Sequence, residues 1–169
     1  MNLNSIRSEF KKWNSGPNKK LGQNFLIDGN IRNKILDASG IKKTDTVLEI
    51  GAGFGALTEG LCDRAEKVVA VEKDRRLCEF LLMNNKAPNL EVVNADILDY
   101  LNDIDISRKF KVVGNLPYYI SSPIITSLIE KRDLFSEIFV TIQKEFADRL
   151  VAVPGKKEYG SISCFTRFY

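Results

Sequence analysis

Residues 46–55 read Thr-Val-Leu-Glu-Ile-Gly-Ala-Gly-Phe-Gly, an apolar run that leads directly into three glycines at alternate positions. The apolar run predicts a buried β-strand, and Ala-Leu-Thr-Glu-Gly-Leu over 56–61 predicts a helix. Glycines between a strand and a helix accept positive φ angles and let a ligand approach the backbone closely. Because Gly51, Gly53 and Ala56 also fit the G-x-G-x-x-A pattern of dinucleotide-binding proteins, the stretch predicts a nucleotide-like ligand without fixing its class.

Four further apolar runs alternate with segments of helical pattern. The expected strands cover residues 68–72, 90–93, 110–113 and 137–142. The expected helices lie near residues 28–38, 56–63, 74–85 and 122–131. Asp28 is placed to cap the first of these helices. The alternation implies right-handed crossovers and therefore predicts an α/β fold with a doubly wound, mostly parallel sheet, in which ligands bind at the carboxyl ends of the strands.

Acidic residues follow the second and third expected strands. Glu72 lies 21 residues after Gly51, where a carboxylate can accept hydrogen bonds from both ribose hydroxyls of a nucleoside. Asp96 follows the strand over 90–93 and can accept a hydrogen bond from an adenine amino group beside the apolar Ile97. Each acid can equally cap a helix or face solvent. Their joint placement at the ends of successive strands favours a bound nucleoside.

The fourth expected strand leads into Gly-Asn-Leu-Pro-Tyr-Tyr over 114–119. The side-chain oxygen of Asn115 and the backbone carbonyl of Leu116 can accept hydrogen bonds from an adenine amine and direct its lone pair at a methyl donor. Pro117 fixes φ and holds that carbonyl in place. Tyr118 can stack on a flipped-out base, an interaction worth about 1–3 kcal/mol. An ordinary Asn-Pro loop with a packed tyrosine is the alternative interpretation.

Taken in this order, the glycine loop, Glu72, Asn94-Ala95-Asp96 and Asn115 to Tyr118 resemble the motifs of S-adenosylmethionine-dependent amino methyltransferases. Two further segments narrow the resemblance to the KsgA family of small-subunit ribosomal RNA adenine dimethyltransferases, from about Lys19 to the C-terminus. These segments are Lys-Lys-Leu-Gly-Gln-Asn-Phe-Leu over 19–26 and Gln-Lys-Glu-Phe-Ala-Asp-Arg-Leu-Val-Ala-Val-Pro-Gly over 143–155 with Lys-Glu-Tyr-Gly-Ser-Ile-Ser over 157–163. The macrolide-resistance methyltransferases of large-subunit RNA are the closest rival. They usually carry Asn-Ile-Pro-Tyr and lack the Pro-Gly-x-Lys-x-Tyr-Gly segment.

The resemblance implies a Rossmann-like class I methyltransferase fold, S-adenosylmethionine as the cofactor and no metal. It implies dimethylation of the 6-amino group of two adjacent adenosines near the 3′ end of small-subunit ribosomal RNA, within a pre-ribosomal subunit. The expected enzyme is a cytoplasmic monomer that serves ribosome biogenesis. A non-catalytic RNA-binding assembly factor that keeps the cofactor pocket is the alternative from another class.

The resemblance also implies roles for individual residues. The catalytic set is Asn115, Leu116, Pro117 and Tyr118. The cofactor-binding set is Gln23, Asn24, Leu26, Gly51, Gly53, Glu72, Asp96, Ile97 and Asn115. For Leu26, simple core packing is the alternative. Glu49 is expected to reach the cofactor's ammonium group.

The two ends of the chain carry separate expectations. Residues 1–18 predict a flexible basic arm before a methyltransferase domain over 19–169. The first 34 residues carry a net charge of +5, against +3 for the whole chain, which with Phe10 and Trp13 favours contact with RNA over a merely solvated leader. Residues 161–169 predict a sixth strand. Because the KsgA family continues into a seventh, antiparallel strand and a C-terminal helical domain, we expect a truncated form of a longer enzyme.

The composition excludes several classes of protein. A length of 169 residues with 44% hydrophobic side chains suits one globular domain, and no apolar run reaches membrane length or resembles a signal peptide. The chain has no histidine, and its three cysteines are widely spaced, which argues against a structural zinc site and favours inert thiols in a reducing compartment. No residues suggest a hydride-transfer site, so the pattern disfavours a dinucleotide oxidoreductase.

Overall fold

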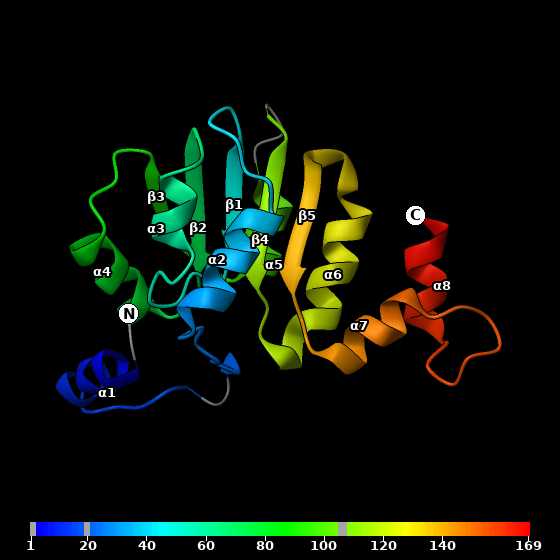
Figure 1. Cartoon of the computed structure of the whole chain (residues 1–169), viewed down its shortest axis with the longest axis horizontal. Helices are drawn as coiled ribbons and strands as arrows, with labels where there is room; N and C mark the ends of the chain where they lie inside the picture. The colour runs from blue at the N-terminus through cyan, green and yellow to red at the C-terminus, as the bar shows by residue number, and fades with distance from the viewer. Residues whose placement is uncertain (1–2, 19–20, 105–107) are drawn as a thin grey trace.

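The protein is described here by a computed structural model, which covers residues 3–18, 21–104 and 108–169 (Figure 1). Lys19 and Lys20, which open the predicted methyltransferase domain and the first segment shared with the KsgA family, lie outside the described residues. Five strands form one sheet in the order β3-β2-β1-β4-β5, and every neighbouring pair is parallel. The strands are β1 (Thr46–Ile50), β2 (Lys67–Glu72), β3 (Leu90–Asn94), β4 (Phe110–Asn115) and β5 (Phe135–Thr141). The prediction of a doubly wound parallel sheet is thus confirmed.

Helices cover both faces of this sheet. The helices of the described residues are α1 (Leu3–Lys12), α2 (Gly29–Ala38), α3 (Thr58–Cys62), α4 (Arg75–Asn84), α5 (Ile97–Asp103), α6 (Ser121–Glu130), α7 (Lys144–Val151) and α8 (Ser161–Phe168), with short 3-10 helices at Tyr118–Ile120 and Arg132–Leu134. The expected cap is present, because the Asp28 side chain accepts hydrogen bonds from two backbone N–H groups in the first turn of α2. None of the described helices is long and apolar enough to cross a membrane.

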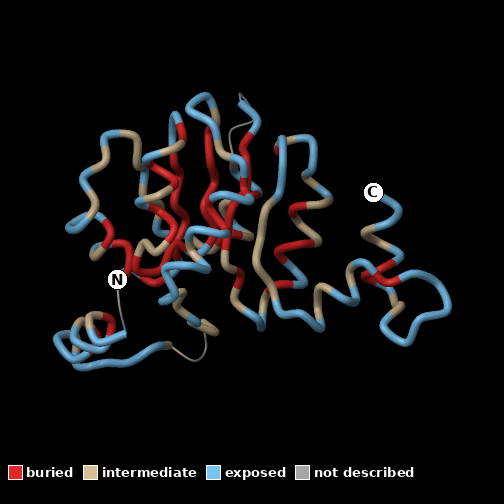
Figure 2. The backbone as a smooth tube through the Cα atoms, viewed as in Figure 1, coloured by how far each residue is buried: buried red, intermediate tan, exposed pale blue. Residues whose placement is uncertain are grey.

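Alternation along the central strands divides the core into two layers. Leu48 and Ile50 of β1 pack with residues of α5 and α6, whereas Val47 packs with residues of α2 and α3. Because successive side chains of a strand point to opposite faces, Glu49 shares the face of Val47. Figure 2 shows that buried residues gather in the sheet and on the helix sides that face it. The face of β1 that carries Val47 therefore places the buried Glu49 carboxyl in the layer formed with α2 and α3.

The glycine-rich turn after β1 adopts the backbone that the sequence predicts. Gly51, Gly53 and Gly55 have φ angles of 71°, 59° and 82°, a region that L-residues with a Cβ rarely adopt. Gly55 is also constrained by space, because a Cβ there would lie 2.7 Å from Leu81 Cδ2. The turn delays the start of α3 to Thr58, two residues after the expected start.

The prediction of a sixth strand over 161–169 is wrong, because residues 161–168 form α8. Figure 1 shows α8 beside α7 and away from the sheet. Ile162 and Ser163 are buried, and the Thr166 hydroxyl donates to the Leu150 carbonyl at 2.8 Å. The segment fits both periods: Ile162 and Cys164 alternate as in a strand, while Ile162 and Thr166 are also one helical turn apart. Packing against α7 selects the helix.

The prediction of a flexible arm over 1–18 is also wrong for residues 3–12, which form α1. Ile6 and Phe10, one turn apart, are buried against Phe54 and Leu77, and Trp13 packs on the same cluster. A ten-residue helix is marginal by itself in water, so its stability comes mainly from this tertiary burial. Asn-Ser-Gly-Pro-Asn over 14–18, residues that disfavour a helix, follows directly after α1 and its last turn.

Candidate active site

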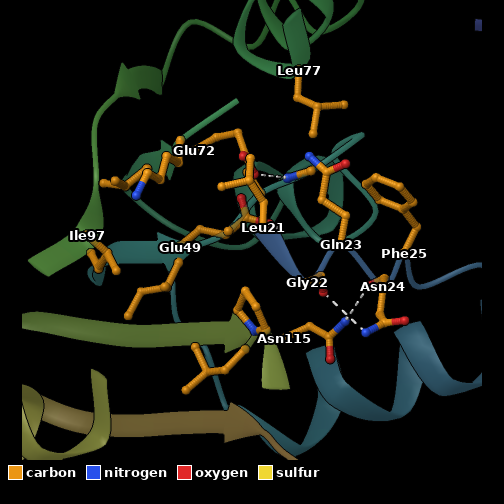
Figure 3. A pocket seen from close by; sticks show the side chains of 18 of the residues that line it. Leu21, Gly22, Gln23, Asn24, Phe25, Glu49, Glu72, Leu77, Ile97 and Asn115 are labelled. Atoms are coloured by element: carbon orange, nitrogen blue, oxygen red, sulfur yellow. Dashed lines mark hydrogen bonds between the residues drawn. The ribbon is translucent and has the colours of Figure 1, made fainter. Parts of the chain in front are cut away.

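One cavity opens at the carboxyl ends of β1, β2 and β4, and Figure 3 shows side chains from several distant segments pointing toward it. The segment before α2, the glycine turn and the loop after β4 all contribute to its walls. Every residue that the sequence assigned to catalysis or cofactor binding lines it: Gln23, Asn24, Leu26, Gly51, Gly53, Glu72, Asp96, Ile97, Asn115, Leu116, Pro117 and Tyr118. Glu49 lines it as well.

Glu49 is a buried acid beside the cavity, with only 2% of its surface exposed. Burial raises the pKa of its carboxyl to about 7, although the Thr58 hydroxyl donates a hydrogen bond to Oε2 at 2.7 Å, which opposes the shift. The nearby charge of Glu72 raises the same pKa further. Among the described residues, neither Glu49 nor Glu72 has an ion-pair partner. A cation bound in the cavity would therefore stabilise the ionised form of both carboxyls.

Glu72 joins the end of β2 to the glycine turn. Its Oε2 accepts a hydrogen bond from the Gly53 N–H at 2.9 Å, and its Oε1 accepts one from the Asp74 N–H at 2.8 Å. Burial raises the pKa of this carboxyl, and the two backbone hydrogen bonds oppose that shift. A carboxylate has about four acceptor positions, so each oxygen keeps a lone pair for a ligand.

Asp96 has two partners of its own. Its Oδ1 accepts a hydrogen bond from the Leu98 N–H at 2.9 Å and caps α5, while its Oδ2 lies 2.6 Å from Lys73 Nζ. The hydrogen bond from Lys73 is the main reason that the pKa of Asp96 is lowered. The helix cap that the sequence left open as an alternative is therefore present. Contact of Asp96 with a ligand stays a prediction.

The loop after β4 is held at the end of the sheet by two neighbours. Asn115 Nδ2 donates to the Asn24 carbonyl at 3.3 Å, and Asn115 Oδ1 accepts from the Thr141 hydroxyl at 2.7 Å. The Leu116 N–H donates to the Thr141 carbonyl at 3.0 Å. Pro117 follows with a φ angle of −62°, and Tyr118 keeps 52% of its surface exposed. The solvent-exposed ring of Tyr118 thus lies in the same loop region as the hydrogen-bonded side-chain amide of Asn115.

The segment over 21–26 connects the two sides of the cavity. The Gln23 side chain donates from Nε2 to Asp74 Oδ2 at 3.0 Å and accepts from the Asn18 N–H at 2.7 Å. Gly22 has a φ angle of 55°, and a Cβ there would lie 2.6 Å from Cδ1 of Tyr119. The segment therefore packs against the loop after β4 while its side chains reach the end of β2.

Several residues of this site were not predicted from the sequence. The Thr58 hydroxyl donates a hydrogen bond to Glu49, and Lys73 donates one to Asp96. The Thr141 hydroxyl donates one to Asn115. Thr141 could have been predicted as a site residue, since a polar residue near the end of the fifth expected strand lies at the edge of the sheet where ligands bind. No sequence pattern predicts the apolar wall formed by Ile6, Phe54 and Leu77, because this wall depends on where α1 docks.

Comparisons with known proteins identify the family of this chain. The model of the family described as ribosomal RNA adenine dimethylase matches residues 14–169. The chain is 40% identical over 172 residues to ribosomal RNA small subunit methyltransferase A of Clostridioides difficile strain 630. This match covers 98% of this chain and 60% of that protein. The solved structure of a dimethyladenosine transferase from Plasmodium falciparum has a TM-score of 0.73 at 35% identity, over 86% of this chain and 53% of that one.

The structure of the 23S rRNA methyltransferase ErmE is also similar, with a TM-score of 0.62 at 33% identity over 75% of this chain and 50% of that one. The chain thus spans about half to three fifths of the length of these relatives. These likenesses confirm the predicted Rossmann-like methyltransferase fold. Because the family model covers nearly the whole sequence, the chain belongs to the ribosomal RNA adenine dimethylase family.

Proposed function

We propose that this chain carries the cofactor-binding and catalytic part of an S-adenosylmethionine-dependent enzyme that dimethylates two adjacent adenosines near the 3′ end of small-subunit ribosomal RNA. The proposed substrate is the RNA within a pre-ribosomal subunit, and the proposed enzyme is a cytoplasmic monomer. One observation carries the proposal: the Asn115–Tyr118 loop lies across a single cavity from the Glu72 carboxylate. Relatives named small subunit methyltransferase A, at about 40% identity, support the choice of RNA.

The cavity fits S-adenosylmethionine on physical grounds. Buried charge is costly unless it is compensated, and the described residues give Glu49 and Glu72 no cationic partner. A ligand with a sulfonium and an ammonium group supplies that compensation. Glu72 would accept hydrogen bonds from the ribose hydroxyls and Asp96 from the adenine amine, while Gly51 and Gly53 allow close approach of the methionine part.

The remaining residues that line the cavity fit the outer contacts of the cofactor. Gln23, Asn24 and Leu26 would close over it, and Ile97, which is buried at the start of α5, would pack beside the adenine ring. When bound, S-adenosylmethionine supplies an electrophilic methyl group.

The protein's own contribution to the reaction is positioning. An adenine amine is a weak nucleophile because its lone pair is delocalised into the ring. Hydrogen bonds accepted by the Asn115 side-chain oxygen and the Leu116 carbonyl would turn that lone pair out of the ring plane and stabilise the positive charge that develops on nitrogen. Pro117 would hold the carbonyl, and the exposed ring of Tyr118 would stack on the flipped base.

A methyl-transfer assay tests this function. The chain is incubated with radiolabelled S-adenosylmethionine and, in parallel reactions, with small subunits that lack dimethyladenosine or with large-subunit RNA, and the modified nucleosides are then mapped. Label in two adjacent adenosines near the 3′ end supports the proposal, whereas label only in large-subunit RNA supports the macrolide-resistance type of activity. Asn115→Ala separates catalysis from assembly: an enzyme loses turnover, while an assembly factor still promotes subunit maturation.

A further inference from the structure

Thr141, at the end of β5, contacts the last residue of β4 and the first residue of the loop that follows it. It lies opposite Asn115 in the parallel register. Its carbonyl accepts a hydrogen bond from the Leu116 N–H at 3.0 Å, and its hydroxyl donates to Asn115 Oδ1 at 2.7 Å. One residue of the neighbouring strand therefore fixes both the backbone and the side chain of the loop.

A carboxamide can be turned end for end with little change in shape, and that turn exchanges its donor and its acceptor. The contacts of Asn115 select one of the two orientations. The Asn24 carbonyl can only accept, so it must face Nδ2, and the Thr141 hydroxyl then donates to Oδ1. Oδ1 has two lone pairs, so one is left for a further donor.

The two contacts of the amide differ in length. The bond to the Asn24 carbonyl is 3.3 Å long, beyond the usual range for an N–H donor, whereas the bond from Thr141 is 2.7 Å, the usual length for a hydroxyl donor. Rotation about the terminal bond of an asparagine side chain is intrinsically soft. Without the hydroxyl, the long contact alone would hold the amide.

We propose that Thr141 is a positioning residue, whose hydroxyl holds the Asn115 carboxamide with its oxygen available to the target amine. This inference rests on the proposed function and adds to it a side chain outside the loop that carries the chemistry. Thr141 lies one strand away from the reacting groups and acts through Asn115.

Thr141→Val tests the inference because valine keeps the branched shape and β-propensity of threonine and removes only the hydroxyl. Thr141→Ser, which restores a hydroxyl, is the rescue variant. Ser136→Ala is the matched control: Ser136 also lies on β5, and its hydroxyl donates to the Phe110 carbonyl at 3.4 Å, at the opposite end of the sheet.

Three measurements are made on each chain: single-turnover methyl transfer to small subunits, calorimetric binding of S-adenosylmethionine, and the ¹⁵N spectrum of the Asn115 side-chain amide. We expect Thr141→Val to slow methyl transfer about tenfold, to leave the cofactor Kd within about twofold, and to broaden or shift the Asn115 amide pair. Thr141→Ser and Ser136→Ala should keep the parent values.

Unchanged methyl transfer and an unchanged Asn115 amide pair in Thr141→Val would overturn the inference. So would an equal loss of rate in Thr141→Val and Ser136→Ala, because that would show a general effect on β5. If the parent chain binds cofactor and transfers no methyl group, the proposed function fails. The amide spectra then decide by themselves whether Thr141 fixes Asn115.

Discussion

The two halves of the cavity are built differently. On the side of β1 and β2, Glu49 and Glu72 are buried in the sheet layer, and Glu72 is bonded to backbone N–H groups on both oxygens. On the side of β4, Asn115 is held by two side-chain contacts, and Tyr118 and Tyr119 are half exposed. The first half is a buried recess of fixed shape, and the second half is an open platform of partly exposed side chains.

This difference matches the demands of the two proposed ligands. A small charged cofactor gains from a dry, preformed recess, because its contacts are then stronger and need no rearrangement. A base within a large RNA must enter from solvent, so the residues that receive it have to be accessible. Changes in the two halves should therefore have separable effects on turnover and on cofactor binding.

The largest separation is expected from Asn115→Ala, in the open half. Loss of the side-chain acceptor should reduce methyl transfer by about 10²- to 10³-fold, since the hydrogen bond is strongest when charge develops on the amine. Cofactor affinity, measured by calorimetry, should change by only a few-fold. A large rise in the cofactor Kd would instead show that Asn115 acts chiefly in cofactor binding, which would contradict the division of the cavity into two halves.

The buried half should make stability depend on pH through Glu49. Its pKa in the folded protein is about 7, above the ordinary value of 4.5, so the folded state holds a proton over a pH range in which the unfolded state has released it. The contribution of Glu49 to the free energy of unfolding therefore falls as pH rises from about 4.5 to 7, by about 3 kcal/mol if the whole shift is expressed.

Urea unfolding at several pH values measures this slope. Glu49→Gln, which cannot ionise, should flatten the part of the slope between pH 5 and pH 7. Asp63→Asn is a suitable control, since Asp63 is an exposed acid just after α3. A slope that persists in Glu49→Gln would assign it to other groups, of which Glu72 is the first candidate because burial also raises its pKa.

Within the same half, Glu72→Ala should weaken cofactor binding by roughly 1–3 kcal/mol through the loss of charge-assisted hydrogen bonds. It also removes the acceptor of the Gly53 N–H, so the thermal midpoint should fall. The matched control is Glu79→Ala on α4, an exposed carboxylate paired with Arg75. An unchanged dissociation constant in a folded Glu72→Ala protein would refute the ribose role.

The same division explains how much the sequence could predict. The buried half is encoded locally, because an apolar run, three glycines and an acid at the next strand end require few partners. The five strands and the position of Glu72 were predicted for this reason, and Asn115 was predicted because it directly follows the fourth apolar run. The residues that support them, such as Thr58 and Thr141, are brought in by the tertiary fold from other elements.

The failed predictions lie at the two ends of the chain, where docking decides the structure. Residues 3–12 and 161–168 are each short, and their patterns admit more than one structure. Ile6 and Phe10 are buried only because Phe54 is in place, and α8 is held by the hydrogen bond that Thr166 donates to α7. Local propensity is a weak guide when most of the stabilisation of a helix comes from tertiary burial.

Gly22→Ala touches both halves at once and should have the smallest effect on the chemistry. Alanine at a φ of 55° is strained by about 1–2 kcal/mol, and its Cβ would lie 2.6 Å from the Tyr119 ring. The ring lies on the open side and is half exposed, so it can move away. We therefore expect modest destabilisation, with methyl transfer and cofactor affinity each lowered by a few-fold.

Gly29→Ala controls for the loss of a glycine, because Gly29 has ordinary φ and nothing within 4 Å of a built Cβ. If Gly22→Ala lowers methyl transfer and leaves cofactor affinity intact, the segment over 21–26 serves the open platform through Tyr119. If it lowers affinity alone, the segment acts on the recess, where Gln23 reaches Asp74. Equal losses would show that this segment couples the two halves, so that closure over the cofactor also sets the loop that receives the base.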